Sequence, residues 1–394
     1  MSRGAVVAVG LAAVLAAFPA AAQPAGGAPS GPFPSRTYRA AVVSESADQL
    51  AEVVLGPGGV QVVRTSQVGV MLADPDGPHG VTASPDGRHL YVTTAHGTPF
   101  GVLWKYRADT HAYLGQVMLG NFPATVTLTP DGGTAAVVNF NLHGHPVASD
   151  VSIVRTDSLQ EVARLTTCAM PHGSRITRDG RRHYSVCMMD DQLVEIDLEG
   201  LQVARHFLLT TGAERGMAGP PPARGADAHA GHDMAGHDMG GHGLAQPAAG
   251  STACSPTWAE PSPDGRTVWV ACNGTSDLVE IDVPTWTLRR RVPAGNGVYN
   301  LAVTHDGRLL VTTNKRGQGV SLIDTQTGAT LATLPSQRRV VLGVAITPDD
   351  RYAFVSVEGV GSEPGTVEVI DLAARRTIGR AEVGQQAGGI AIIP

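Results

Sequence analysis

Alternating apolar and polar positions recur in short runs along most of the chain. Near its middle, the turn sequence Ser262-Pro-Asp-Gly265 separates two such runs, and in the second run Val268 and Val270 alternate with their neighbours. Alternation with a period of two predicts β-strands, and a proline followed by Asp-Gly predicts a tight turn. The runs at residues 278–281 and 287–292 complete a predicted meander of four strands.

The same unit returns at regular spacing. Copies centre on six turn sequences, which are Ser84-Pro-Asp-Gly87, Thr129-Pro-Asp-Gly132, Thr177-Arg-Asp-Gly180, Ser262-Pro-Asp-Gly265, Thr304-His-Asp-Gly307 and Thr347-Pro-Asp-Asp350. Consecutive copies lie 42–48 residues apart, except that an additional stretch stands between the third and the fourth. A four-stranded repeat of this length is typical of a β-propeller blade.

A seventh copy is divided between the two ends of the chain. Residues 388–394 match a first strand and stop at the turn proline, whereas residues 39–44, 49–54 and 60–64 match strands two to four. Joining them in one blade would close the ring and leave no open edge between blades. The predicted fold is therefore all-β, a seven-bladed β-propeller with four-stranded antiparallel blades.

Several predicted strands resemble the YVTN-type β-propeller repeat. The second strands that carry the resemblance are Tyr91-Val-Thr-Thr94 and Val311-Thr-Thr-Asn314, and the third strands are Leu278-Val-Glu-Ile-Asp282, Val320-Ser-Leu-Ile-Asp324 and Val367-Glu-Val-Ile-Asp371. The resemblance covers residues 39–394 apart from 209–253. It implies a propeller that belongs among surface-layer proteins, secreted binding proteins, lactonase-like enzymes, or relatives of the nitrous oxide reductase and amine dehydrogenase propellers. Because one fold carries many functions, the site has to decide among these.

Four segments are expected along the chain. Residues 1–22 combine Arg3, an apolar run and three alanines before Gln23, which predicts a signal peptide, with a short membrane anchor as the alternative. Residues 23–38 are rich in Pro, Gly and Ala and predict a disordered linker. Residues 39–394 are expected to form the propeller, with 209–253 as an insertion between blades three and four. A cleaved signal peptide predicts a periplasmic or secreted protein that does not span a membrane.

The four cysteines are placed symmetrically about two of the turns. Cys187 and Cys272 each follow the aspartate of their turn by eight residues, and Cys168 and Cys254 precede it by eleven and ten. A β-hairpin brings residues equidistant from its turn opposite each other. In an exported protein this favours the disulfides Cys168–Cys187 and Cys254–Cys272. Metal-bound thiolates and reduced or differently paired cysteines are the alternatives.

The insertion carries the most unusual chemistry in the sequence. The pentad Ala-Gly-His-Asp-Met occurs twice in tandem, and residues 229–242 contain His229, His232, Met234, His237, Met239 and His242. Imidazole suits Cu(II), Ni and Zn, whereas thioether selects Cu(I), so this mixture favours a copper ion over zinc or nickel. The segment is similar to the His/Met-rich segments of periplasmic copper-handling proteins. The alternative is a solvated low-complexity loop that binds metal only incidentally.

Two further histidines occupy the entrance of first strands. Pro78-His79-Gly80 and Pro171-His172-Gly173 begin blades one and three, and together with His143 or His145 they could form a mononuclear copper site. The other blades have no histidine at this position, which argues against a multinuclear cluster like that of nitrous oxide reductase. The alternative is that these imidazoles only make structural hydrogen bonds. Five histidines are interpreted as structural or surface residues: His89, His111, His183, His206 and His305.

One charged pair is expected inside the channel. Alternation along the first strands places Arg175 and Glu260 at equivalent channel-facing positions of neighbouring blades, where the other blades have Thr or Ala. A structural ion pair is favoured, and a site for a substrate carboxylate at Arg175 is the alternative.

These observations leave three functional hypotheses. The first is a non-catalytic propeller that captures or delivers a metal ion, together with a periplasmic or membrane partner protein. The second is a propeller enzyme, either a copper oxidoreductase or a lactonase-like hydrolase, and the third is an interaction scaffold. The net charge of −6 gives no electrostatic footprint for a nucleic acid, which is not an expected partner.

Overall fold

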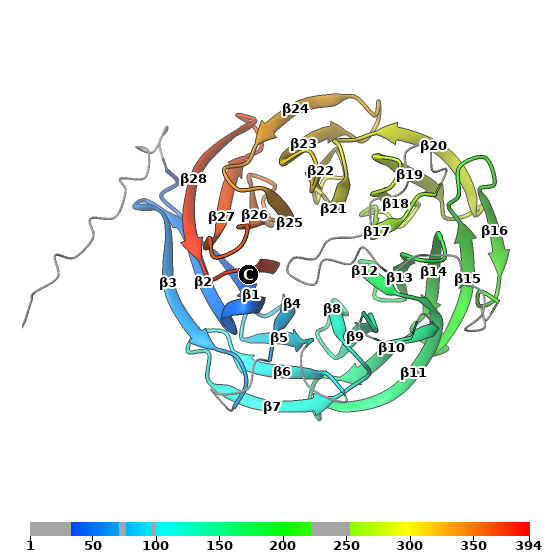
Figure 1. The fold of residues 1–394 in the computed structure, drawn as a ribbon, viewed down its shortest axis with the longest axis horizontal. Coiled ribbons are helices and arrows are strands. Elements are labelled where there is room, and N and C mark those ends of the chain that lie inside the picture. Colours follow the sequence, from blue (N-terminus) through cyan, green and yellow to red (C-terminus); the bar gives the residue numbers. More distant parts are fainter. Residues whose placement is uncertain (1–32, 71–75, 96–99, 143, 146, 223–252) are drawn as a thin grey trace, which may run out of the picture.

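Seven antiparallel sheets surround a central channel in the computed structural model (Figure 1). The structure describes residues 33–70, 76–95, 100–142, 144–145, 147–222 and 253–394. Each sheet is one blade, and in six of the seven the strands follow one another outward from the channel in chain order. The predicted seven-bladed β-propeller is therefore confirmed.

The first strand of each blade lines the channel and the later strands lie outside it. Blades one and two consist of β4 (Pro78–Ala83), β5 (His89–Thr94), β6 (Val102–Arg107) and β7 (Tyr113–Met118), then β8 (Pro123–Leu128), β9 (Thr134–Asn139), β10 (Ala148–Arg155) and β11 (Gln160–Ala169). Blades three and four consist of β12 (Pro171–Ile176), β13 (Arg182–Cys187), β14 (Gln192–Asp197), β15 (Gln202–Leu208) and β16 (Arg215–Ala218), then β17 (Pro256–Pro261), β18 (Thr267–Cys272), β19 (Asp277–Asp282) and β20 (Thr287–Pro293). Blades five and six consist of β21 (Val298–Val303), β22 (Leu309–Asn314), β23 (Gly319–Asp324) and β24 (Thr330–Pro335), then β25 (Val340–Ile346), β26 (Tyr352–Glu358), β27 (Gly365–Asp371) and β28 (Arg376–Val383).

The seventh blade joins the two ends of the described chain. Its strands are β29 (Ala387–Ile393), β1 (Tyr38–Ser44), β2 (Gln49–Gly56) and β3 (Gly59–Gln67), with the short 3-10 helix η1 (Glu45–Ala47) between β1 and β2. β29 pairs antiparallel with β1, so that Arg39 lies opposite Ile393 and Ser44 opposite Ala387. The ring closes as predicted, with the inner strand supplied by the C-terminal end.

The repeated turn sequence explains why each first strand reverses into the second. In blade one the Ser84 hydroxyl donates to Asp86, the backbone N–H of Arg88 donates to the same carboxylate at 3.0 Å, and the N–H of His89 donates to Ser84 Oγ at 2.9 Å. Gly87 has a φ of 67°, a region that favours glycine. Equivalent Ser/Thr–Asp bonds occur in the other five turns.

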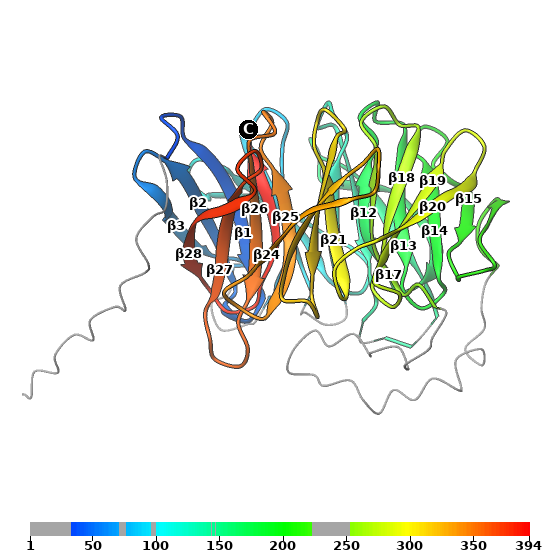
Figure 2. The same ribbon diagram turned by 90° about the horizontal axis from the view of Figure 1, so that it is seen from above.

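Apolar side chains fill the spaces between neighbouring blades. Tyr184 and Val186 of blade three, for example, pack with Val268 and Val270 of blade four in one buried cluster. Burying one such aliphatic side chain contributes about 1.5–3 kcal/mol. These buried clusters hold the inner strands at fixed positions around the channel. Figure 2 shows the ring of blades edge-on, with its two faces at the two ends of the strands.

Two details extend the ordered fold beyond the sequence prediction. Phe33, within the predicted linker, packs against the core cluster between blades six and seven. β16, within the predicted insertion, pairs with β15 as a fifth strand of blade three. The stretch 215–218 contains no alternating apolar pattern, so its pairing could not be predicted from periodicity.

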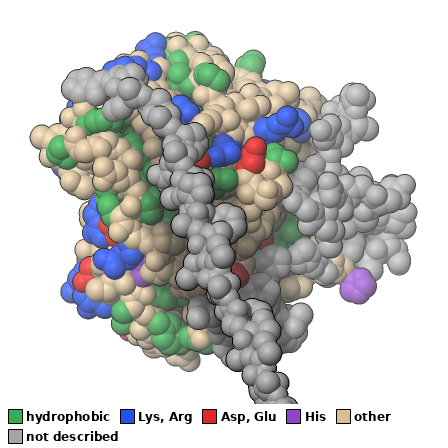
Figure 3. All heavy atoms as spheres, turned by 60° about the vertical axis from the view of Figure 1, so that its left-hand side comes forward, with side chains coloured by type: hydrophobic (Ala, Val, Ile, Leu, Met, Phe, Trp, Pro, Cys, Tyr) green, Lys and Arg blue, Asp and Glu red, His purple; other side chains and the backbone are tan. Residues whose placement is uncertain are grey.

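The described surface is mixed in charge. On the side shown in Figure 3, Lys and Arg side chains lie in separate small groups, several of them beside Asp or Glu. No helix among the described residues is long and apolar enough to cross a membrane.

Candidate functional site

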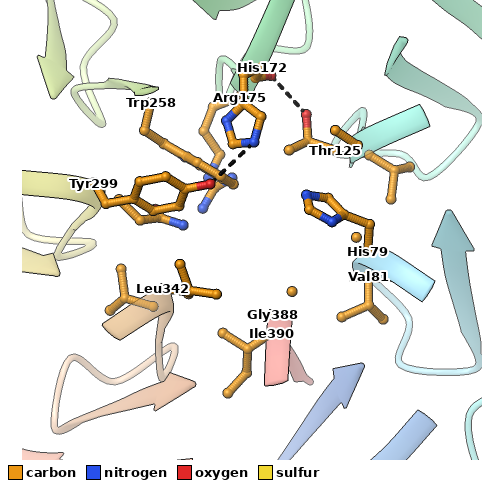
Figure 4. Close-up of a pocket in the computed structure, with 17 residues that line it drawn as sticks. His79, Val81, Thr125, His172, Arg175, Trp258, Tyr299, Leu342, Gly388 and Ile390 are labelled. Atoms are coloured by element: carbon orange, nitrogen blue, oxygen red, sulfur yellow. Dashed lines mark hydrogen bonds between the residues drawn. The ribbon is translucent and has the colours of Figure 1, made fainter. Parts of the chain in front are cut away.

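The seven inner strands begin at one end of the channel, which we call the histidine mouth. It is lined by His79 and His172 and by Trp258, Tyr299, Leu342 and Gly388 (Figure 4). These residues surround a small cavity of about 70 Å³. The structure thus brings His79 and His172 together, with 6.1 Å between their ring centroids.

The glycine that follows each histidine is required by the neighbouring blade. A Cβ at Gly173 would lie 2.3 Å from the Thr257 carbonyl oxygen and 2.5 Å from the Trp258 ring, and one at Gly80 would lie 2.4 Å from the Ala124 oxygen. These distances are too short for any larger residue. The Pro-His-Gly sequence therefore lets two blades approach closely while the preceding imidazole lines the mouth.

His172 is held from both of its ring nitrogens. Its Nδ1 lies 3.0 Å from the Thr257 carbonyl oxygen and its Nε2 lies 3.4 Å from the Tyr299 hydroxyl. Because a carbonyl oxygen only accepts, Nδ1 carries the proton and Tyr299 donates to Nε2. Burial, with the charges of Glu358 and Glu45, raises the pKa of Tyr299, so its hydroxyl keeps the proton it donates. A metal ion at His172 Nε2 would have to displace this hydroxyl.

His79 is anchored by a carboxylate and by aromatic rings. Its Nδ1 lies 2.8 Å from Glu45 Oε2, which η1 supplies from the seventh blade. The ring also packs edge-on against Phe122 at 5.4 Å between centroids, and Phe140 packs against His172 at 4.8 Å. The histidine mouth therefore combines two oriented imidazoles with an aromatic wall.

The other predicted metal ligands are distributed differently. His145 is exposed, and its carbonyl oxygen accepts a hydrogen bond from Asn141 at 3.0 Å. His143 and the whole set His229, His232, Met234, His237, Met239 and His242 lie outside the described residues. Within the described part of the chain, no group of three or more His, Cys, Asp or Glu side chains is arranged to hold a metal ion. The mononuclear axial site stays a prediction.

Both predicted disulfides are present. Cys168–Cys187 and Cys254–Cys272 join Cα atoms 5.8 Å and 4.6 Å apart, and no described cysteine is free. The second one lies where the chain re-enters the propeller after the insertion. Asp191 also fixes this part of the chain. Its carboxylate accepts hydrogen bonds from the backbone N–H of Cys254 at 3.0 Å, from that of Ser255 at 2.8 Å, and from the Thr210 hydroxyl at 3.0 Å.

The predicted charged pair lies deeper in the channel. Arg175 Nε is 3.0 Å from Glu260 Oε2, and the Arg175 guanidinium lies 4.9 Å from the centroid of the Trp258 ring. Burial raises the pKa of Glu260 to about 7, although Arg175 and Arg178 oppose this shift. The pairing of Arg175 with Glu260 is confirmed.

A larger cavity of about 350 Å³ opens beyond this pair, at the end of the channel where the inner strands finish. We call this end the arginine mouth and define it by Arg175, Arg178, Glu260 and His305, all of which line the cavity. The sequence analysis did not single out Arg178 and interpreted His305 only as a structural or surface residue. Both replace the turn proline that four other copies have, which is the signal that could have found them.

Comparisons with known proteins support the fold alone. No protein-family model matches the chain, so the likeness of its repeats to the YVTN type stays a prediction. No curated protein matches it either. Among solved structures it is similar to Kuenenia stuttgartiensis hydrazine synthase, with a TM-score of 0.55 and 20% identity over 77% of this chain and 78% of that one. It is also similar to a functionally unknown protein from Desulfotomaculum acetoxidans, with a TM-score of 0.63 and 13% identity over 90% of this chain and 98% of that one.

Proposed function

We propose that this chain is an exported copper-binding β-propeller in which residues 229–242 capture the ion as cargo. The tandem Ala-Gly-His-Asp-Met pentad carries the proposal, because it gathers four imidazoles and two thioethers within fourteen residues. Imidazoles suit Cu(II) and thioethers suit Cu(I), so the segment offers ligands for both oxidation states. The cysteines do not compete for the ion, since all four are paired in disulfides.

Two features of the described structure support this function. The segment re-enters the propeller at Cys254, three residues before Thr257, whose carbonyl oxygen binds His172 in the histidine mouth. The described end of the segment therefore lies on the face of the propeller that carries this mouth, and we propose that a periplasmic or membrane partner protein accepts the copper on that face. The two disulfides suit the oxidising compartment in which such a protein would work.

Removing the segment tests the proposal. The full chain is exported by a bacterial host grown with added copper, and the purified protein is analysed for Cu, Zn and Ni together with a variant that lacks residues 226–245. We expect the full chain to contain copper and the variant to lose most of it. We also expect Met234→Leu with Met239→Leu to weaken mainly Cu(I) binding, because thioether is the softer ligand.

Two controls separate metal capture from indirect effects. In the first, residues 226–245 keep their length and only the four histidines and two methionines are replaced, by Gln and Leu, and copper should still be lost. In the second, His79→Ala with His172→Ala should leave most of the copper in place. Full copper stoichiometry in the deletion variant would show that the segment is not the site.

A further inference from the structure

Several residues that differ from the repeat pattern lie at the arginine mouth. Four of the six turn sequences have proline at their second position, and the two exceptions are Arg178 and His305. At the channel-facing position near the end of the inner strands, five blades have Thr or Ala, and the two exceptions are Arg175 and Glu260. All four exceptions come from the consecutive blades three, four and five, and all line the 350 Å³ cavity. The repeat needs none of them for its turns or strands, so their convergence indicates a function of the cavity.

The cavity has an available cation. Arg175 is engaged with Glu260 and Trp258, whereas Arg178 is exposed and pairs with no acidic side chain among the described residues. An arginine fork presents parallel N–H donors that match the two oxygens of a carboxylate. Arg178 is therefore placed to receive an anion at the rim of the cavity.

His305 is held in position by an unusual residue of the next blade. Asp350 accepts from the His305 backbone N–H and from its Nδ1, both at 2.7 Å. Asp350 has a φ of 57° at a position where the other five turns have glycine. A left-handed backbone conformation is less favourable for aspartate than for glycine, although aspartate tolerates it better than most other residues. The two hydrogen bonds that Asp350 accepts from His305 offset this cost.

The rest of the lining supplies hydrogen-bond donors and small apolar walls. The Thr127 hydroxyl is buried and has no hydrogen-bond partner among the described atoms, although it belongs to a cavity-lining residue. Glu260, with its pKa near 7, is partly protonated at neutral pH and can then donate a hydrogen bond. Ala302, Ala345 and Ala391 leave room beside these groups.

We propose that the arginine mouth binds a small organic carboxylate, whose charged group pairs with Arg178 and whose hydrocarbon body lies against Ala302, Ala345 and Ala391. Donors from one side and small apolar residues from the other suit such a molecule better than an inorganic oxyanion, which has no apolar part. This inference does not rest on the proposed copper function, because it is argued only from propeller residues that the structure describes.

Calorimetric titration of the full chain with succinate tests the inference. We expect saturable binding to the wild type with a Kd in the millimolar range or below, and a Kd at least about tenfold higher in Arg178→Gln, equivalent to about 1.4 kcal/mol. The matched control is Arg308→Gln, because Arg308 is an exposed arginine just after the blade-five turn and outside the cavity lining. Its Kd should equal that of the wild type.

A second variant and two further ligands make the outcome decisive. Arg178→Pro restores the proline of the other turns, so it should fold normally and still lose succinate binding. Inorganic phosphate and the neutral succinamide should both bind more weakly than succinate. Absence of saturable succinate binding, equal binding by Arg178→Gln and the wild type, or tighter binding of phosphate than of succinate would each overturn the inference.

Discussion

Glu260 is a carboxyl group placed where most blades have a small uncharged residue. Only 13% of its side chain is exposed, and the exposed part faces the channel cavity. Arg175 attracts the ionised form, as do the charge of Arg178 and the backbone N–H of Val303, yet burial outweighs all three and the pKa is raised to about 7. Desolvation of a buried charge commonly exceeds the energy that its partner returns. Glu260 also lines the cavity of the arginine mouth, where its carboxyl group is placed to contact a bound ligand.

The raised pKa predicts how Glu260 affects stability as pH changes. Between about pH 4.5 and about pH 7 the folded state holds a proton that the unfolded state has released. The contribution of protonated Glu260 to the free energy of unfolding is therefore complete below about pH 4.5 and is lost as pH rises through about 7. A shift from 4.5 to about 7 corresponds to about 3 kcal/mol. In urea unfolding, the wild type should therefore lose about 3 kcal/mol relative to Glu260→Gln between about pH 4.5 and about pH 8. Parallel pH profiles of the two proteins would contradict this.

At the scale of elements, residues of blades three and four hold the chain in place at both ends of the segment between β16 and β17. Cys254–Cys272 fixes the chain to β18, and Asp191 bridges Cys254 and Ser255 to Thr210. On the other side, Glu214 just before β16 accepts from Arg291 of β20 at 2.7 Å. The two blades are therefore joined independently of the residues that we propose to bind copper, and this is why the deletion variant should fold.

Removing the disulfide Cys254–Cys272 should lower the free energy of unfolding without unfolding the ring. Cys254 and Cys272 are 18 residues apart, and a crosslink that closes a loop of this size stabilises by about 3 kcal/mol. We expect Cys254→Ala with Cys272→Ala to lose about that amount in urea unfolding. Cys168→Ala with Cys187→Ala is the matched control, because its loop spans 19 residues, and its loss should be similar. A reductant that leaves the wild type unchanged in stability would argue against both disulfides.

Local chemistry explains how much of this fold could be predicted from the sequence. The turns were predictable because Ser or Thr, Asp and Gly act within one turn, and the disulfides because hairpin symmetry fixes which cysteines face each other. β16 was missed because its pairing depends on contacts with the next blade: a Cβ on Gly216 would lie 2.1 Å from the Trp286 ring. The arginine mouth was predicted only in part: alternation placed Arg175 and Glu260 in the channel, whereas Arg178 and His305 lie far apart in sequence and line the same cavity only when the ring closes.

For the whole molecule, closure of the ring depends on one short strand. β29 contributes no hairpin of its own, yet it pairs with β1 and lies between β25 and β4, the inner strands of the neighbouring blades. Ala387 and Ile393 near its ends are buried in two different core clusters. Without β29, the seventh blade would lose its innermost strand, and β1 would present an unpaired edge to the channel.

Deleting residues 386–394 should therefore abolish cooperative unfolding. The deletion removes the pairing partner of β1 and the apolar contacts of Ile390 and Ile393, and it opens the channel between blades six and one. We expect the shortened chain to lose its sharp thermal transition and to expose apolar surface that binds a hydrophobic dye. The deletion of residues 226–245 is the control, because it removes more residues and none of the described strands, and it should keep a single transition. A shortened chain that melts sharply at the temperature of the wild type would show that β29 does not close the ring.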